Sequence, residues 1–340
     1  MNTEQKKHHF TIPVFIPMEA CPFQCIFCDQ DRISGRTTIP EPVEVNSIIQ
    51  RHLATIPEKG SDIEVGFFGG TFTGLSPEKQ KVYLEAVLPF TESGRIAGIR
   101  LSTRPDFISS RILELLGRYP VRTIELGAQS MDDEVLRKSG RGHTSSQTRE
   151  ASALILAAGF SLGLQMMVGL PGDTEEKAVN TAKRIIESGA SETRIYPVIV
   201  IKGTPLEKLF REGKYLPLEL DEAIQITKDV VRVFDESNVK IIRIGLHPSE
   251  GLLNRKEYIA GPFHVSFREL VMTALWTDRF RKILEEKQGE SIGIRVNPAD
   301  LNPAIGYYGK NRKLLEKHFR SVKFLPDPEI KEKKFHADRH

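Results

Sequence analysis

The feature that most constrains the fold is a regular alternation of short apolar segments with helical patterns, which repeats about every 30 residues. Six such units follow one another along the chain. Their strand segments are apolar throughout rather than alternating, which is typical of strands buried on both faces of a parallel sheet. The expected strands are Phe10–Ile16, Ile63–Phe68, Ile99–Ser102, Thr123–Leu126, Leu162–Val168 and Arg194–Val200. The pattern predicts an α/β fold, either a barrel or an open doubly wound sheet.

Helix boundaries between these strands have recognisable signals. Ser76 stands before Pro77, which is the arrangement of a side-chain cap followed by proline in the first turn. Gly159 and Gly189 follow segments with a single apolar stripe, where a glycine is expected to end a helix. The signals support repeated units in which each helix covers the sheet with one face.

The rhythm changes after about residue 205. We expect a helix over Leu218–Phe234, a strand over Val239–Ile244 and a helix over Phe267–Lys287. The domains expected are an α/β core over 1–250, a connecting irregular segment and helix over 251–290, a small α/β module over 291–326 and a charged tail over 327–340. We expect the tail to be frayed.

Composition excludes several classes of protein. The chain has 340 residues with a formal net charge of +3, which is too small for the whole surface to bind nucleic acid by charge alone. No apolar run approaches the length that spans a bilayer, and the first ten residues lack the apolar stretch of a signal peptide. We therefore expect a cytoplasmic protein without a membrane partner.

All three cysteines of the chain, Cys21, Cys25 and Cys28, lie in one loop directly after the first expected strand. An odd number in one tight group is a poor disulfide framework, so we predict a metal site. Three thiolates at C-x3-C-x2-C spacing can ligate three irons of a cubane cluster and leave the fourth open. The alternative is a zinc site that a histidine such as His8 or His9 completes.

This cysteine loop resembles that of the radical S-adenosylmethionine (SAM) enzymes, whose C-x3-C-x-aromatic-C motif is complete here. The resemblance implies a partial (β/α)6 barrel of the TIM type. It also implies a [4Fe-4S] cluster on Cys21, Cys25 and Cys28, whose unique iron binds SAM and cleaves it reductively to methionine and a 5′-deoxyadenosyl radical. Phe27 matches the aromatic residue that packs near the adenine in that family.

A second match is Gly69-Gly70-Thr71, which follows the second expected strand as the family's glycine-rich motif does. Glycines there let backbone carbonyls approach the methionine amino group closely. The surrounding Phe67–Leu75 resembles the subgroup that includes the elongator catalytic subunit and oxygen-independent coproporphyrinogen oxidase. A plain turn is the alternative interpretation of Gly-Gly alone.

Further blocks resemble the same subgroup in the same order. By position, Gln129 matches a polar residue near the SAM sugar, and Arg141 matches the residue that pairs with the SAM carboxylate. An arginine fork suits a carboxylate geometrically. Ser102 and Gln165 stand where coproporphyrinogen oxidase relatives carry acidic residues, and a Gln side chain can still bond a ribose hydroxyl.

Over about residues 10–250, the sequence is most similar to the radical SAM half of the elongator catalytic subunit. That enzyme attaches a carboxymethyl-type group to the wobble uridine of tRNA and needs an acetyltransferase domain, and this sequence ends about where that domain would begin. We therefore do not expect its full reaction. Glu125, Tyr196 and Lys202 are candidate substrate residues at or inside the barrel, although a buried Glu paired with a cation can also be structural.

The small module resembles a minimal KH fold, which has two helices joined by a GXXG loop that clamps a nucleic-acid backbone. The loop here is Gly306 to Gly309, and Lys310, Arg312 and Lys313 begin a basic helix after it. A solvated basic helix after a glycine turn is the alternative.

Taken together, the motifs predict a radical SAM enzyme that acts on RNA, with tRNA as the favoured substrate and a reductant such as flavodoxin or ferredoxin as partner. Two other classes stay open: a porphyrin or heme-related radical SAM protein, and an RNA-binding protein with a structural cluster. The sequence has no further cysteines to ligate a second cluster, so we do not favour sulfur insertion, which would need one.

Overall fold

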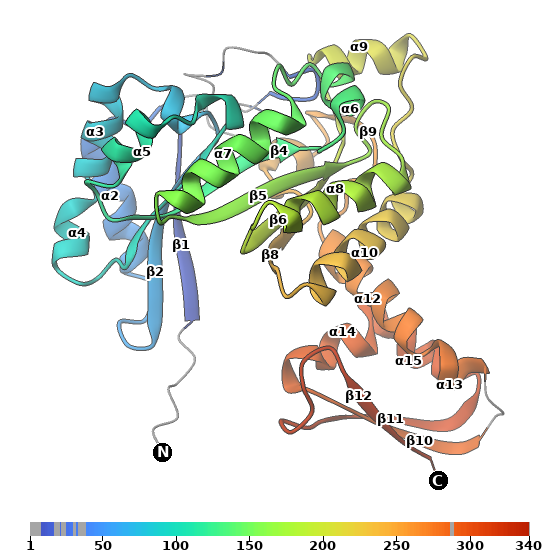
Figure 1. The fold of residues 1–340 in the computed structure, drawn as a ribbon. Helices are drawn as coiled ribbons and strands as arrows, with labels where there is room; N and C mark the ends of the chain where they lie inside the picture. The colour runs from blue at the N-terminus through green and yellow to red at the C-terminus, as the bar shows by residue number, and fades with distance from the viewer. Residues whose placement is uncertain are drawn as a thin grey trace.

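The computed structural model describes residues 8–16, 21, 25–29, 32, 39–285 and 289–339, and its main body is a seven-stranded parallel sheet (Figure 1). The strands lie in the order β1-β2-β3-β4-β5-β6-β8, with β1 and β8 at the two edges. They are β1 (His8–Phe15), β2 (Ser61–Phe68), β3 (Gly98–Thr103), β4 (Val121–Gln129), β5 (Ser161–Val168), β6 (Glu192–Pro197) and β8 (Lys240–Ile244). The expected partial barrel is confirmed, and the strand expected at Val239–Ile244 is its seventh member.

Helices cover the outer face of this curved sheet. They are α2 (Pro42–Leu53), α3 (Pro77–Glu85), α4 (Leu88–Glu92), α5 (Ser110–Leu116), α7 (Ser145–Ala157), α8 (Glu175–Glu187) and α10 (Leu220–Glu236). The short helix α6 (Asp133–Lys138) lies instead at the end of the sheet, where its Val135 packs in the apolar group that contains Cys25. The Ser76 hydroxyl accepts from the backbone N–H of Lys79, which confirms the predicted cap of α3. Within the described ranges, no helix is long and apolar enough to cross a membrane.

The two faces of the sheet differ in chemistry. Residues on the helix-covered face, such as Ile99 and Leu101, are fully buried in the main apolar core. Each such side chain contributes about 1.5–3 kcal/mol when it leaves water. Alternate positions on the same strands carry Arg100, Ser102 and Glu125, which face the concave side. The expectation of strands that are apolar on both faces was therefore wrong for the interior of the barrel.

The expected strand Arg194–Val200 is broken in the structure. β6 ends at Pro197, and β7 (Val200–Ile201) pairs instead with β9 (Tyr258–Ala260) in a separate antiparallel ribbon. Two short helices flank this ribbon, α9 (Pro205–Arg211) and α11 (Glu250–Leu253). The segment after β6 thus leaves the barrel and packs over the end of the sheet.

A single helix, α12 (Phe267–Arg279), joins the barrel to a C-terminal module. Its Val271 and Leu275 belong to the barrel core, whereas Trp276 belongs to the core of the module. The module comprises α13 (Arg281–Glu285), β10 (Gly289–Val296), α14 (Leu301–Ile305), α15 (Lys310–Leu315), β11 (Phe319–Pro326) and β12 (Phe335–Arg339). Because one continuous helix contributes to both cores, the two parts are held together by packing as well as by chain connection.

The expected frayed tail is wrong for residues 335–339, which form β12. This strand pairs antiparallel with β10 and completes a three-stranded sheet in the order β11-β10-β12. The physical reason is aromatic packing: the Phe335 ring lies 6.3 Å from that of Trp276 and 5.2 Å from that of Phe280. The tail was expected to fray because most of its residues are charged, and the packing of Phe335 was not evident from the sequence.

Candidate functional site

The three cysteines lie at the carboxyl-terminal edge of the sheet, after β1. Cys25 is buried, whereas Cys21 and Cys28 are partly buried. The Cys21 sulfur lies 3.2 Å from the Thr71 hydroxyl, which brings the cysteine loop next to the glycine-rich turn after β2. The backbone N–H of Cys28 donates to the Cys25 carbonyl at 3.0 Å. Residues 22–24 lie outside the described residues.

Backbone bonds and apolar packing anchor the loop from its other side. The N–H of Ile26 donates to the Ser139 carbonyl at 3.2 Å, and the Ile26 carbonyl accepts from the N–H of Leu206 at 2.8 Å. Phe27 is buried in the same apolar cluster as Cys25 and Leu206. Ser139, which follows α6, and Leu206 of α9 therefore hold the loop at the rim of the barrel.

Two buried arginines approach the Cys25 sulfur. The Nη1 of Arg141 donates to it at 3.1 Å, and the Nη1 of Arg104 lies 4.0 Å away. Asp106 holds Arg104 with two bonds of 2.9 Å, and Arg104 in turn donates to the backbone carbonyl of Arg141. N–H donors and positive charge of this kind suit the sulfur ligands of an anionic cluster. Sequence reasoning had assigned Arg141 to the site but had not assigned Arg104.

Several polar atoms beside this pair are buried without a hydrogen-bond partner among the described residues. They are the Oε1 of Gln129, the Nε of Arg141 and both ring nitrogens of His143. Burial, followed by the charges of Arg141 and Arg104, lowers the pKa of His143 to about 3, so its imidazole is neutral. Unpaired buried donors and acceptors are costly unless a ligand satisfies them. Their grouping indicates a binding site for a polar molecule.

Backbone geometry leaves room for these side chains. Gln129 ends β4 with a positive φ of 64°, and Gly127 before it bears no side chain. A Cβ on Gly127 would lie 3.0 Å from the Gln129 amide nitrogen and 3.4 Å from the Nη2 of Arg141. After β2, Gly69 has a φ of +103°, which side-chain-bearing residues rarely adopt. The turns after β2 and β4 thus have backbone conformations that leave room for the side chains of Gln129 and Arg141.

Below this rim, the barrel interior contains a layer of buried ions centred on Arg100. Its guanidinium contacts Glu64 at 2.8 Å, Glu125 at 2.8 Å and Glu192 at 3.0 Å. Burial by itself raises the pKa of Glu125, but Arg194 and Arg100 outweigh it, so the pKa lies below its usual value. Burial raises the pKa of Glu192 despite the contact with Arg100.

The predicted residues Ser102, Gln165 and Glu125 meet at the top of this layer. The amide nitrogen of Gln165 donates to the Ser102 hydroxyl at 3.2 Å and to a Glu125 oxygen at 2.9 Å. Arg194 holds the same carboxylate with bonds of 2.6 and 3.0 Å. Ser102 and Gln165 are partly buried, so they can still face a ligand from above.

Lys202, the third candidate substrate residue, does not join this layer inside the barrel. It is exposed, and its backbone N–H donates to the Glu257 carbonyl in the turn after β7. The reason is that β6 ends at Pro197, so the chain has left the barrel before it reaches Lys202. Tyr196 is partly buried within β6, where burial raises its pKa.

Sequence reasoning missed the charged partners Arg100, Glu192 and Arg194. Their signal was a period of two: polar residues occupy every second position of β3 and of β6. Such alternation marks one polar face, and only the sheet order shows that the polar faces meet.

The zinc alternative fails on geometry. His8 and His9 begin β1, whereas the cysteine loop follows its end, and eight extended residues separate the two by about 23 Å. His9 instead contacts Asp62 at 3.2 Å. Among the described residues, no three Cys, His, Asp or Glu side chains are grouped around a single point as for one metal ion. Three thiolates that each bind a different iron of a cubane do not need to converge in that way.

Comparison with known proteins agrees with this geometry. The Radical SAM superfamily matches residues 15–185, which is half of the chain, and the Radical_SAM C-terminal domain matches residues 190–277. This chain belongs to the radical SAM superfamily. It is therefore an enzyme of the class that uses a [4Fe-4S] cluster and SAM.

Relatives of this radical SAM enzyme are 26–29% identical to it over segments that cover about two thirds of its length. Uncharacterized protein MJ0486 of Methanocaldococcus jannaschii is 29% identical over 234 residues, 66% of this chain and 71% of that protein. The tRNA uridine(34) acetyltransferase of the same organism is 26% identical over 254 residues, 63% of this chain and 47% of that enzyme. The chain thus spans about half the length of that acetyltransferase.

A solved structure shows the same fold. The archaeal Methanocaldococcus infernus Elp3 with an N-terminal deletion (1-46) superposes with a TM-score of 0.63 at 21% identity. The match covers 82% of this chain and 63% of that chain.

The residues present fit the cofactors of the radical SAM family. The three cysteines lie at the strand ends with N–H donors on Cys25, and the unpaired atoms of Gln129, Arg141 and His143 lie beside them. Thr71 is also at the site, in contact with Cys21. These side chains offer hydrogen-bond donors and acceptors suited to a zwitterionic, ribose-bearing ligand.

The structure gives the GXXG loop a packing role. Gly306 is buried against α12, and the N–H of Tyr307 donates to the Thr273 hydroxyl at 2.8 Å. The N–H of Gly306 donates to the Asn302 carbonyl, and that of Gly309 donates to the Gly306 carbonyl. These three N–H groups are thus used within the protein. Lys310, Arg312 and Lys313 after the loop are exposed.

Proposed function

We propose that this radical SAM enzyme modifies RNA, with tRNA as the first substrate to test. The observation that carries the proposal is the similarity over 254 residues to an enzyme named for its action on uridine 34 of tRNA. The exposed basic side chains of the C-terminal module support it, because a polyanionic substrate requires local positive charge.

In this proposal Cys21, Cys25 and Cys28 hold the cluster, and Gly69, Gly70 and Thr71 form the wall beside them. When bound there, the cluster and SAM would supply a 5′-deoxyadenosyl radical for hydrogen abstraction from the substrate. Arg141 would bind the SAM carboxylate through its unpaired Nε while its Nη1 stays on Cys25. Phe27 would pack near the adenine.

In this proposal, Gln129, Ser102 and Gln165 would orient the sugar of SAM and the ribose or base of the substrate. Gln129 would bind the SAM sugar through the Oε1 that has no partner among the described residues. Ser102 and Gln165 are linked to one another and would present one hydroxyl and one amide to a ribose or base above them. Glu125, fixed by Arg100 and Arg194, would act as a positioning residue for Gln165 rather than contact the substrate directly.

RNA would contact the module through Lys310, Arg312 and Lys313 at the start of α15. All three are exposed, and the Arg312 guanidinium lies 5.8 Å from the centre of the Phe324 ring, which restrains its position. In this proposal, side-chain charge rather than the glycine backbone attracts the phosphates, because three N–H groups of the loop already have partners.

The experiment is anaerobic reconstitution with iron and sulfide, reduction with dithionite, and chromatography of 5′-deoxyadenosine with and without tRNA. We expect tRNA to stimulate production, and the same tRNA treated with ribonuclease to lose that effect. Cys25→Ala serves as the background control. A reduced flavodoxin or ferredoxin in place of dithionite tests the proposed class of electron donor.

Production that is indifferent to RNA would contradict the substrate proposal while leaving the radical chemistry intact. Tight RNA binding with no 5′-deoxyadenosine under any condition would instead favour an RNA-binding protein with a structural cluster.

A further inference from the structure

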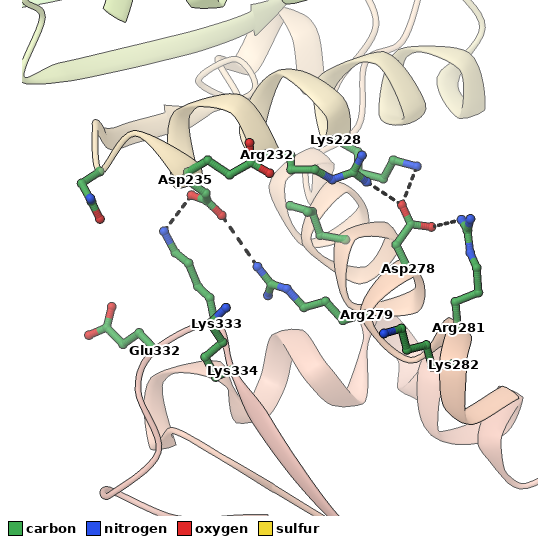
Figure 2. A pocket seen from close by; sticks show the side chains of 13 residues that line it. Lys228, Arg232, Asp235, Asp278, Arg279, Arg281, Lys282, Glu332, Lys333 and Lys334 are labelled. Atoms are coloured by element: carbon green, nitrogen blue, oxygen red, sulfur yellow. Dashed lines mark hydrogen bonds and ion pairs between the residues drawn. The ribbon is translucent and has the colours of Figure 1, made fainter. Parts of the chain in front are cut away.

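A cavity of about 890 Å³ lies where the barrel meets the C-terminal module (Figure 2). Its walls come from α10, from the end of α12 with α13, and from the turn that leads into β12. Of its 13 lining residues, seven are basic and four are acidic. We call it the junction cavity.

Within the junction cavity, the carboxylate of Asp278 forms ion pairs with three basic side chains. Asp278 lies 2.8 Å from the charged nitrogens of Lys228, Arg232 and Arg281. Asp229 also contacts Arg232 at 2.9 Å and Lys228 at 4.0 Å, so two carboxylates face three cations. This side of the cavity therefore keeps surplus positive charge.

A second carboxylate of the cavity, Asp235, lies on α10 with Lys228 and Arg232. Lys333 contacts it at 2.7 Å and Arg279 at 3.8 Å (Figure 2). The Nη1 of Arg279 is buried and makes no hydrogen bond within the described residues. The Trp276 ring, 4.7 Å from this guanidinium, fixes its position. An unused N–H donor thus lies in the wall of the cavity, together with the Oδ2 of Asp235, which is also buried without a hydrogen-bond partner among the described residues.

Two further cations stand at the mouth. Lys282 on α13 and Lys334 before β12 line the cavity, and both are exposed. Exposed lysines are available to a large anion without prior loss of a buried contact.

We propose that the junction cavity binds phosphate groups of the RNA backbone. The inference rests on the proposed RNA substrate and names where that substrate is held outside the active site. Its lining, all within the described residues, has no aromatic ring on which a base or a free nucleotide would stack, and Leu275 is its one apolar residue. The cavity can therefore bind a ligand mainly by ionic contacts. In RNA the charged groups are the backbone phosphates, so these are the groups that we expect it to bind.

Position favours a long ligand over a small anion. The cysteine loop is at the carboxyl ends of the strands, whereas the C-terminal module lies beyond their amino ends (Figure 1). A small anion bound in the junction cavity would be too far from the cysteine loop to react there. A folded RNA is large enough to contact the cavity and the active site at the same time. Because α12 belongs to both cores, the distance between the two contacts is fixed. The cavity would thus help to select the length and shape of the substrate.

The test compares two double variants with the same change in net charge. Lys282→Glu with Lys334→Glu alters the junction cavity, and Lys59→Glu with Lys81→Glu alters exposed residues before β2 and on α3. All four residues are exposed, so both proteins should fold, which circular dichroism checks. Binding of a fluorescent tRNA transcript to the reconstituted protein is measured by anisotropy over a salt series.

We expect the junction variant to bind more weakly and with a smaller salt dependence. Each phosphate contact contributes about 0.7–0.9 to the slope of log K against log salt, so two lost contacts remove about 1.4–1.8. If the electrostatic contribution vanishes near 1 M salt, the loss at 0.1 M is about 25- to 60-fold. The control variant should keep the wild-type slope.

Equal affinity and slope in the two double variants would overturn the inference while RNA binding itself stands. A wild-type protein that binds no RNA would overturn both this inference and the proposed function. Tripolyphosphate serves as a small-anion probe in thermal unfolding. One contrary result is that tripolyphosphate raises the Tm of the wild type and the control variant but not that of the junction variant, while all three bind RNA equally well. That result would identify a small-anion site and would refute the assignment to RNA.

Discussion

Replacement of Arg100 by methionine tests the ion layer inside the barrel. Arg100 is 2% exposed and holds three carboxylates, at 2.8, 2.8 and 3.0 Å. In the variant, Glu125 keeps Arg194 and Gln165, but Glu64 and Glu192 lose their guanidinium partner. Removal of one member of a buried ion pair costs about 3–5 kcal/mol, because the remaining charge is left in a medium of low polarity. We expect a loss of about that size at pH 7.5.

The pH dependence distinguishes this cause from loss of packing. Burial already raises the pKa of Glu192 in the wild type, and loss of Arg100 raises it further above the unfolded value of about 4.3, so the folded variant binds more protons than the unfolded chain. Stability of the variant then falls as pH rises and returns as pH falls, by up to about 1.4 kcal/mol per pH unit for this carboxyl group. The loss should be largely relieved at pH 5.5.

The measurement is urea unfolding of the apoprotein, followed by far-ultraviolet circular dichroism at pH 5.5 and 7.5. Arg122→Met on β4 is the matched control, because that side chain is 53% exposed and its contact with Asp62 is 3.8 Å. We expect this control to change the unfolding free energy by no more than about 0.5 kcal/mol. The reasoning is refuted if the two variants lose the same stability, or if the Arg100→Met loss does not depend on pH.

Three further predictions concern the rim. Cys25→Ala should abolish the optical and paramagnetic signals of the reconstituted cluster, and a variant with a full cluster would remove Cys25 from the ligands. Arg141→Ala should weaken SAM binding, measured by calorimetry, by about 1.5–3 kcal/mol as a charge-assisted bond is lost, whereas unchanged affinity would remove Arg141 from the SAM site. Burial raises the pKa of Asp173 to about 6, so its contribution to stability is present below pH 4 and is lost as pH rises through 6. Asp173→Asn should therefore gain thermal stability over wild type between pH 4.5 and 7, and a constant difference in Tm would contradict this.

Much of the fold could be predicted because its signals are local. The alternation of apolar segments and helical stripes predicted the strands of the barrel, and Ser76 predicted the start of α3. A cysteine spacing of three and two residues is likewise local, so the cluster loop was predictable. The resemblance then supplied roles for Arg141 and Gln129, which the structure places beside Cys25 and Gly127.

The rest depended on which segments become neighbours. Ser102 and Gln165 are 63 residues apart, and Arg100 and Glu192 are 92 apart, yet each pair is in contact because the sheet order places their strands near one another. Lys202 lies outside the ion layer because β6 ends before it, and β12 was missed because its partner Trp276 lies on a distant helix.

By itself, the sequence determined the repeated β/α units and a three-cysteine loop, because near neighbours along the chain determine both. Only the tertiary structure decided that polar strand faces form a closed ion layer under the rim. It also decided that the module leaves a cationic cavity against the barrel. The physical reason is that charge balance is a sum over residues that folding brings together, and the chain order does not contain that sum.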